Sequence, residues 1–531
     1  MVKKLYPLVF LLSSLLACKK QNDRPQWEVN VLGPLAHATL GVNNFIADSI
    51  IKTDNLSAVS LVYEDNIYTT DLDSLFQIPD TSFPNVFVFP LPSFALGSNT
   101  PIYSNSNVIA LNISGVALRE VIVKSGYLHV NAINKLQTNV IYTYTIPKAT
   151  LNGTQFQFSV NMNPAPPGGS TSYAASFDMS GYKIDLTGAN GNQVNTISYD
   201  VTARTALNAA NDTIYNGDTL VNILAGFHDI IPYYAKGYLG QNEIDQGLTS
   251  DYFSPFAAIK SGSIRLKDVT MKLIIENNVG VDAQSFISQL HSVNTRTNNV
   301  VALAAPQLIN HTININRAVE NGNPSYPVNP SYYTVVLDHS NSNLVPFIEN
   351  LPDRFDYALK LNVNPLGNIS GSNDFVYSDY LVNIKLKIEM PLAFAADHIT
   401  LSDTTELVIP NKEDFDPIGP GTFTVITDNG FPFDADLHVA LLDEHDQLID
   451  SLPVSGYVAA APVDGNFKVI APKRTKIPVY VDQARKQRIL NAKEISMRVS
   501  FTTPGYPQPI QIYSDYKLNV KLVADASYLI H

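Results

Sequence analysis

Apolar and polar residues alternate along much of the chain, and this pattern predicts β-strands. An apolar residue at every second position places the apolar side chains on one face of an extended strand. Asn-Gly and Asp-Gly pairs, which favour tight turns, separate such runs at 152–153, 190–191 and 464–465. The clearest alternating runs are residues 264–267, 382–388, 495–501 and 516–522. We therefore predict a mainly β chain of several antiparallel β-sandwich-like domains in tandem, with a few short helices.

Three short segments have the spacing of amphipathic helices. A Ser or Asp, both favoured helix N-caps, precedes each of them. The segments are residues 343–351 after Ser342, 483–490 after Asp482 and 283–290 after Asp282. We expect helices of at most about three turns, which pack an apolar face on the core.

The first residues have the pattern of an exported protein. Lys3 and Lys4 precede a mostly apolar run over residues 5–17, which is shorter than the roughly 20 residues that span a bilayer. A basic start, a short apolar core and a small residue before a cleavage point predict a secretory signal peptide. Leu15-Leu16-Ala17-Cys18 resembles the lipobox of bacterial lipoproteins. This resemblance implies cleavage between Ala17 and Cys18 and lipid on the Cys18 thiol.

Cys18 is the only cysteine in the 531 residues. An intramolecular disulfide and multi-cysteine metal or redox motifs are therefore excluded. Two or more acyl chains, such as palmitate, hold a protein stably on a membrane, where one chain is marginal. In the lipoproteins that Cys18 resembles, Asp after the cysteine retains the protein in the inner membrane. Lys19 stands there instead, so the resemblance implies an outer-membrane location, with the membrane as a partner through the lipid.

Clusters of Pro, Gly, Asn and Asp suggest where domains end. Residues 97–101, 321–324 and 414–421 are such clusters. We expect a signal peptide over 1–17, a lipidated tether over 18–30, and an N-terminal β region over 31–100. A β-sandwich-like domain over 101–255, a β-rich domain with short helices over 256–412, and a C-terminal β-sandwich-like domain over 422–531 complete the division.

A weak internal repeat also recurs. A strand-like run ends in Asn, and a second strand follows. The copies are residues 128–134, 273–278, 359–364 and 423–429. True duplication and chance repetition of strand-turn-strand units both account for the pattern.

The repeat, above all VITDNGFPFDADLHVALLD at 425–443, resembles the late-embryogenesis-abundant type 14 β-sandwich family. It is also similar to the tubular lipid-binding superfamily. The chain departs from both families. The Asn-Pro pair of the first occurs only in the copy at Asn364-Pro365, and the long helices of the second are missing. The resemblances cover a few tens of residues and imply a β-sandwich without carrying an activity.

The negative net charge argues against polyanions as electrostatic partners. The chain has 48 acidic and 35 basic residues, a net charge of −13. Removal of Lys3 and Lys4 with the signal peptide leaves 33 basic residues, and 33 minus 48 is −15. Nucleic acids and anionic lipid head groups are therefore not expected as electrostatic partners.

Candidate chemistry is sparse. The chain has no G-x-S-x-G elbow, no G-x-G-x-x-G, no P-loop and no H-E-x-x-H, so we predict no catalytic residues and no cofactor. Asp443, Glu444 and Asp446 form a candidate cation site, for which a solvated turn is the alternative. Tyr233, Tyr234 and Tyr238 form a candidate ligand surface, for which core packing is the alternative. His129 and His438 lie in strand-like runs, and we interpret them as surface or satisfied histidines.

Three hypotheses follow for function. The first is a lipid-anchored, non-enzymatic cell-envelope protein that serves as a structural or interaction module, with envelope proteins as partners. The second is a carrier of a lipid or another apolar ligand, which predicts a continuous apolar tunnel between sheets. The third is a polysaccharide-binding or polysaccharide-degrading envelope protein, whose enzymatic form requires paired carboxylates in an aromatic-lined cleft.

Overall fold

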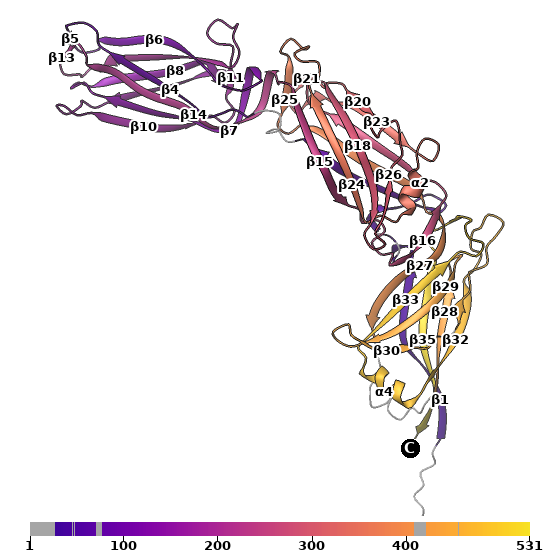
Figure 1. The fold of residues 1–531 in the computed structure, drawn as a ribbon. Coiled ribbons are helices and arrows are strands. Elements are labelled where there is room, and N and C mark those ends of the chain that lie inside the picture. The colour runs from indigo at the N-terminus through magenta and orange to yellow at the C-terminus, as the bar shows by residue number, and fades with distance from the viewer. Residues whose placement is uncertain are drawn as a thin grey trace, which may run out of the picture.

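The chain folds into three β-sandwich bodies that follow one another in a bent row (Figure 1). The computed structural model describes residues 27–530, except 45, 47, 71–76, 408–420 and 455. We name the bodies by their place in the chain. The terminal body contains both ends of the described chain, the middle body adjoins it, and the inserted body lies at the other end of the row (Figure 1). The predicted mainly β fold class is confirmed.

The terminal body contains two antiparallel sheets. Its strands are β1 (Trp27–Gly41), β16 (Ser261–Leu266), β27 (Ala393–Glu406), β28 (Gly421–Asn429), β29 (Asp434–Leu442), β30 (Leu448–Leu452), β31 (Tyr457–Val458), β32 (Lys473–Val481), β33 (Glu494–Thr502), β34 (Ile510–Gln511) and β35 (Lys517–Ile530). One sheet has the order β1-β35-β28-β32, and the other has the order β16-β27-β33-β29-β30, with β31 and β34 at its margins.

The middle body also packs two sheets face to face. Its strands are β2 (Ile51–Thr53), β3 (Val59–Thr69), β15 (Asn242–Tyr252), β17 (Thr270–Asn277), β18 (Ala283–Asn294), β19 (Asn299–Ala302), β20 (Thr312–Ile315), β21 (Val319–Asn323), β22 (Tyr326–Asn329), β23 (Ser331–Leu337), β24 (Arg354–Val363) and β26 (Val382–Pro391). The sheets have the orders β2-β3-β26-β17-β23 and β15-β24-β18-β19, and β21 and β22 form a separate hairpin. The short 3-10 helices η2 (Val42–Asn44) and η3 (Asp48–Ile50) precede β2.

The inserted body is built from one sheet that supplies both layers. Its strands are β4 (Thr81–Val88), β5 (Ser93–Leu96), β6 (Pro101–Ala110), β7 (Ala117–Asn134), β8 (Val140–Leu151), β9 (Thr154–Met162), β10 (Thr171–Asp178), β11 (Lys183–Asp185), β12 (Thr196–Thr205), β13 (Asp212–Tyr215) and β14 (Thr219–Tyr238). The main path is β25-β14-β7-β11-β8-β12-β6, where β25 (Asp374–Tyr377) comes from a later part of the chain. β5 and β13, far apart in the chain, form a separate two-stranded antiparallel sheet.

The bodies are nested along the chain, which differs from the tandem segments expected from loop composition. Residues 31–100 contribute β1 to the terminal body, β2 and β3 to the middle body and β4 to the inserted body. β15, within 101–255, pairs with β24 of the middle body, and β27, within 256–412, pairs with β33 of the terminal body. Loop composition marks chain reversals, whereas these bodies are defined by pairings between distant strands.

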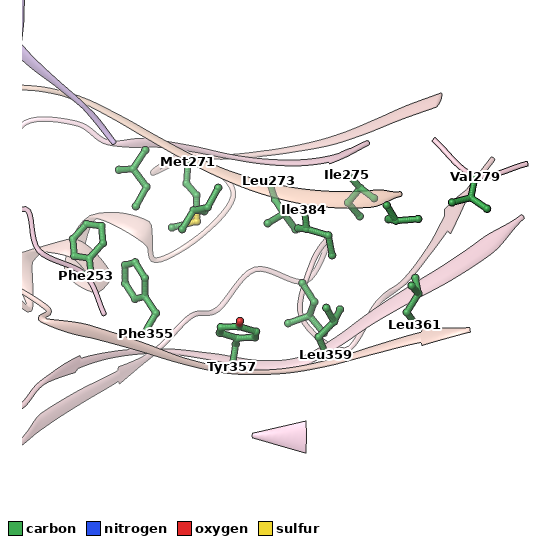
Figure 2. Packing of buried hydrophobic residues seen from close by; sticks show 14 of the residues in the cluster. Phe253, Met271, Leu273, Ile275, Val279, Phe355, Tyr357, Leu359, Leu361 and Ile384 are labelled. Carbon is green, nitrogen blue, oxygen red and sulfur yellow. The ribbon is translucent and has the colours of Figure 1, made fainter. Parts of the chain in front are cut away.

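The apolar residues of the alternating runs fill the cores, as the sequence predicts. In β26 every second side chain from Val382 to Met390 is buried, and the intervening ones are partly exposed. Leu386 lies opposite Leu273 and Ile384 lies opposite Ile275. Figure 2 shows Leu273, Ile275 and Ile384 facing Phe355, Tyr357 and Leu359 of the other sheet. Each such buried side chain stabilises the fold by about 1.5–3 kcal/mol.

Two of the three predicted helices form. α2 (Leu344–Glu349) begins after Asn343, whose side chain accepts the backbone N–H of Ala304 and makes no cap bond. α4 (Gln483–Asn491) begins after Asp482, whose carboxylate caps it by accepting the N–H of Arg485 at 2.7 Å.

The helix predicted over 283–290 is wrong, because this segment belongs to β18. Ala283, Ser285 and Ile287 are buried at every second position, which is the period of a strand. Asp282 does not cap a helix, since its carboxylate binds the Arg317 guanidinium at 2.7 Å.

The strand-Asn repeat has a common structural basis, with one copy in each body. In these three copies the Asn Oδ1 accepts the backbone N–H of the residue two positions later in the chain. Its Nδ2 donates to the carbonyl four residues on and to the carbonyl of a distant loop, and all of these distances are 2.8–3.0 Å. The residues are Asn134, Asn277 and Asn429, each fully buried. The predicted second copy ended at Asn278, but Asn277 forms the network, and Asn278 instead donates to the carbonyl of Leu381. The shared network supports the hypothesis that the three bodies repeat one structural unit.

The fourth copy of the repeat is different. Asn364 has φ +48° and donates to the carbonyl of Gly240 and to the carboxylate of Asp374. Asp374 is buried and also receives the N–H of Leu239 and the guanidinium of Arg317. Because Leu239 and Gly240 connect β14 to β15, this network fixes the connection between the inserted and middle bodies.

Candidate functional site

The candidate tyrosines lie where the inserted and middle bodies meet. Tyr234 is buried against Tyr377, with ring centroids 4.6 Å apart, and Tyr233 meets the same ring edge-on at 5.8 Å. The structure does not bring Tyr238 into this cluster, although it ends the same strand. Tyr233 and Tyr234 thus pack within a small apolar cluster that also contains Phe375.

A carboxylate closes that cluster on its polar side. Glu320 receives the hydroxyl of Tyr234 and the ammonium of Lys236, both at 2.6 Å. Burial alone favours the protonated form of Glu320, but the bonds from Lys236 and Tyr234 hold the pKa of this carboxyl below its ordinary value. Burial and the bond to Glu320 raise the pKa of Tyr234. The arrangement holds β14 against the β21–β22 hairpin.

The candidate cation residues lie in the turn between β29 and β30. The Asp443 carboxylate accepts the backbone N–H groups of His445 and Gln447 at 2.8 and 2.9 Å, which stabilises the turn. These two bonds lower the pKa of Asp443. Glu444 is exposed and lies 4.0 Å from the ring of His445, and Asp446 has φ +59°. Among the residues that the structure describes, no group of three or more His, Cys, Asp and Glu side chains is arranged to hold a metal ion.

Ala17 and Cys18 lie outside the described residues. Cleavage and lipidation there stay predictions. Within residues 27–530, apart from the gaps given above, no helix is long and apolar enough to cross a membrane.

The middle body has a narrow apolar cavity between its two sheets. Its volume is about 40 Å³, whereas small-molecule sites commonly measure about 300–1,000 Å³. Tyr357, whose ring is labelled in Figure 2, lies at this cavity and donates its hydroxyl to Asp251 at 2.8 Å. Burial and this bond raise the pKa of Tyr357. At this place in the described structure, the continuous apolar tunnel that a lipid carrier requires is not present.

A larger groove of about 410 Å³ crosses the outer face of the inserted body. It runs over the adjacent strands β4, β14, β7 and β10. The surface is recessed here because several lining residues have small side chains. Gly226 lies at its floor, where a methyl group would come within 3.0 Å of His228 Nε2 and Ser82 Oγ. The sequence supplies the groove by placing Ala, Gly and Ser at outward positions of neighbouring strands.

Two histidines meet in this groove. The rings of His129 and His228 have centroids 4.8 Å apart, and Tyr127 stacks on His129 at 6.1 Å. His228 Nδ1 lies 2.9 Å from Asp80 Oδ2. The backbone N–H of Asp229 and the ring of His228 together hold the pKa of Asp80 below its ordinary value. A β-bulge between His228 and Ile231 interrupts the pairing with β7 here, and bulges re-aim side chains at such places.

Sequence reasoning identified His129 only as a surface histidine and did not identify its neighbours. Asp80 and His228 are 148 positions apart, and His129 reaches His228 only because β7 pairs with β14. The sequence could have indicated this histidine cluster only if the pairing of β7 with β14 had been known. The groove offers imidazole, hydroxyl and aromatic groups on an open surface, which suits recognition of a polar partner.

Comparisons with known proteins add little to this picture. No known protein family and no curated protein matches the sequence. Among solved structures, a candidate secreted protein from Parabacteroides distasonis has 10% sequence identity and a TM-score of 0.28, with 94% of this chain and 99% of that chain covered. A structure of infectious bursal disease virus, Gx strain, has 8% identity and a TM-score of 0.14, with 86% and 82% covered. Scores this low carry no inference about fold or function.

Proposed function

We propose that the protein is a lipid-anchored cell-envelope protein that acts as a non-enzymatic interaction module. One observation supports this proposal above the others. The chain enters the terminal body at Trp27, while the inserted body lies at the opposite end of the row (Figure 1). A tether of nine residues from Cys18 to Trp27 reaches at most about 30 Å. Lipid on Cys18 therefore keeps the terminal body near the membrane and presents the inserted body away from it.

The anchor is tested by the Cys18→Ser variant expressed in a Gram-negative host. We expect the parent chain in the membrane fraction after washing with high salt, and the variant in the soluble fraction, because the thiol that takes the lipid is missing. Asn22→Ala, in the same tether, serves as the control and should stay with the membrane. A Cys18→Ser chain that still sediments with membranes would contradict the anchor.

The interaction is tested in the groove of the inserted body. Ser176 lines this groove and is exposed, so a photo-crosslinking residue in its place should capture an envelope protein in living cells. Ser104, exposed on β6 of the other layer, gives a matched control and should capture less than one tenth as much. Equal capture from both positions, or none from Ser176, would count against the groove as the interaction surface.

A further inference from the structure

The terminal body has a second groove, which differs in chemistry from the groove on the inserted body. Its volume is about 850 Å³, and it lies over β27, β33, β29 and β30, next to the start of β16. Its basic lining residues are Lys260, His438 and Arg498, and no carboxylate is among the lining residues. Five Ser and Thr side chains, including Thr400, also line it. A basic, hydroxyl-rich groove is unexpected on a chain with a net charge of −13.

The basic residues in this groove have no internal counter-charge. Arg498 lies directly opposite His438 across the β29–β33 pair, and both side chains are exposed on the same face of the sheet. Within the described part of the chain, Lys260, His438 and Arg498 have no ion pair. Asp436 shares the strand with His438 but lies opposite Ser500 and forms no ion pair with Arg498. Asp450 of β30 is already bound by Arg485 at 3.1 Å and Arg488 at 2.8 Å.

Arg474, another arginine of the same body, shows the contrasting arrangement. Arg474 on β32 binds Asp428 with two bonds of 2.7 and 2.9 Å, and this pairing lowers the pKa of Asp428. Arg498 differs from Arg474 in that no carboxylate of the described residues binds it, so its guanidinium is open to an external anion. An external anion in this groove could accept hydrogen bonds from Arg498 and supply the counter-charge that Arg498 and Lys260 lack.

We propose that this groove binds a segment of an acidic polysaccharide through its carboxylate groups. Arg presents a planar set of donors that matches a carboxylate, and Lys adds a mobile point charge. Ser and Thr hydroxyls both donate and accept hydrogen bonds, which suits the hydroxyl groups of the sugar rings. The groove volume lies within the range of about 300–1,000 Å³ that is common for ligand sites. The site does not depend on the lipid anchor, so either proposal can fail without the other.

The test uses the chain from residue 18 to 531 with Cys18→Ser, titrated calorimetrically with alginate oligosaccharides. Neutral dextran oligosaccharides of equal length are the ligand control. We expect alginate to bind, dextran not to bind, and the affinity for alginate to fall steeply with added salt. Arg498→Ala and His438→Ala should each weaken alginate binding at least tenfold. Lys476→Ala, which removes an exposed positive charge from β32 of the other sheet, should leave binding within twofold of the parent.

Stability separates recognition from a structural role. Because Arg498 is exposed and forms no ion pair within the described residues, Arg498→Ala should leave the unfolding temperature unchanged, and Arg498→Gln provides a second variant of similar size. The proposal is overturned if alginate does not bind, if dextran binds equally, or if Lys476→Ala weakens binding as much as Arg498→Ala. Binding confined to vesicles that contain phosphorylated glycolipid would also overturn it.

Discussion

Deletion of residues 517–531 is expected to abolish folding of the terminal body and to leave the inserted body intact. These residues form β35, which lies between β1 and β28 in the sheet. Without β35, β1 loses its pairing from Trp27 to Gly41. Burial of Leu518, Val520 and Leu522 is lost as well. At about 1.5–3 kcal/mol for each side chain, the loss approaches the roughly 5–15 kcal/mol that stabilises a whole domain.

Limited proteolysis with mass spectrometry measures this outcome. The truncated chain should lose all protection over residues 421–516 and keep a resistant fragment near residues 79–240. As a control, replacement of the exposed turn 166–169 by two glycines should leave the terminal body protected. Protection of residues 421–516 in the truncated chain would show that β35 is not required for this body.

Asn429→Ala is expected to destabilise the terminal body by about 3–5 kcal/mol. The substitution leaves the carbonyls of Phe433 and Ala459 and the N–H of Phe431 without their partner. A buried polar group without a partner costs about 1–3 kcal/mol, and water has little access where Asn429 is fully buried. Asn134→Ala should have the same effect in the inserted body, where the network is the same.

Urea denaturation, with proteolysis that reports on each body separately, measures the destabilisation of the terminal body by Asn429→Ala and of the inserted body by Asn134→Ala. Asn105→Ala is the matched control, because this exposed residue bonds only to the side chain of Asn107, and we expect a change below about 0.5 kcal/mol. Asn429→Asp keeps the acceptor but places a charge in the core, so it should be at least as damaging as alanine. If Asn429→Ala were as mild as Asn105→Ala, the repeated network would not contribute to stability.

Local structure was predictable where a short pattern determines it. The alternation in residues 382–388 and 495–501 and the Asp482 cap are each contained within about ten residues, and each formed as expected. The segment after Asp282 shows the limit of such signals. Its cap residue is correct for a helix, but Arg317, 35 positions away, binds that carboxylate, and the apolar residues pack on the period of a strand.

The body plan and the grooves were not predictable from local patterns. Pairing of β1 with β35 joins residues almost five hundred positions apart, and nothing within either strand specifies the other. The same holds for the sites. His438 was interpreted as a surface histidine, which is correct, but its position opposite Arg498 depends on the register of β29 and β33. A sequence shows which residue types are available. Which of these residues share a surface depends on the pairing of several strands that are distant in the chain.

The nested order also affects biosynthesis. A chain is synthesised from its N-terminus, and domains generally fold as units in that order. Here β1 emerges first, yet its partner β35 is the last strand to appear. During most of synthesis β1 is an unpaired edge of the kind that invites aggregation. The inserted body, whose strands run from β4 to β14 except for the edge strand β25, can close first, the middle body second and the terminal body last. This order predicts that β1 is the segment that a chaperone must shield for longest, until residue 530 is available.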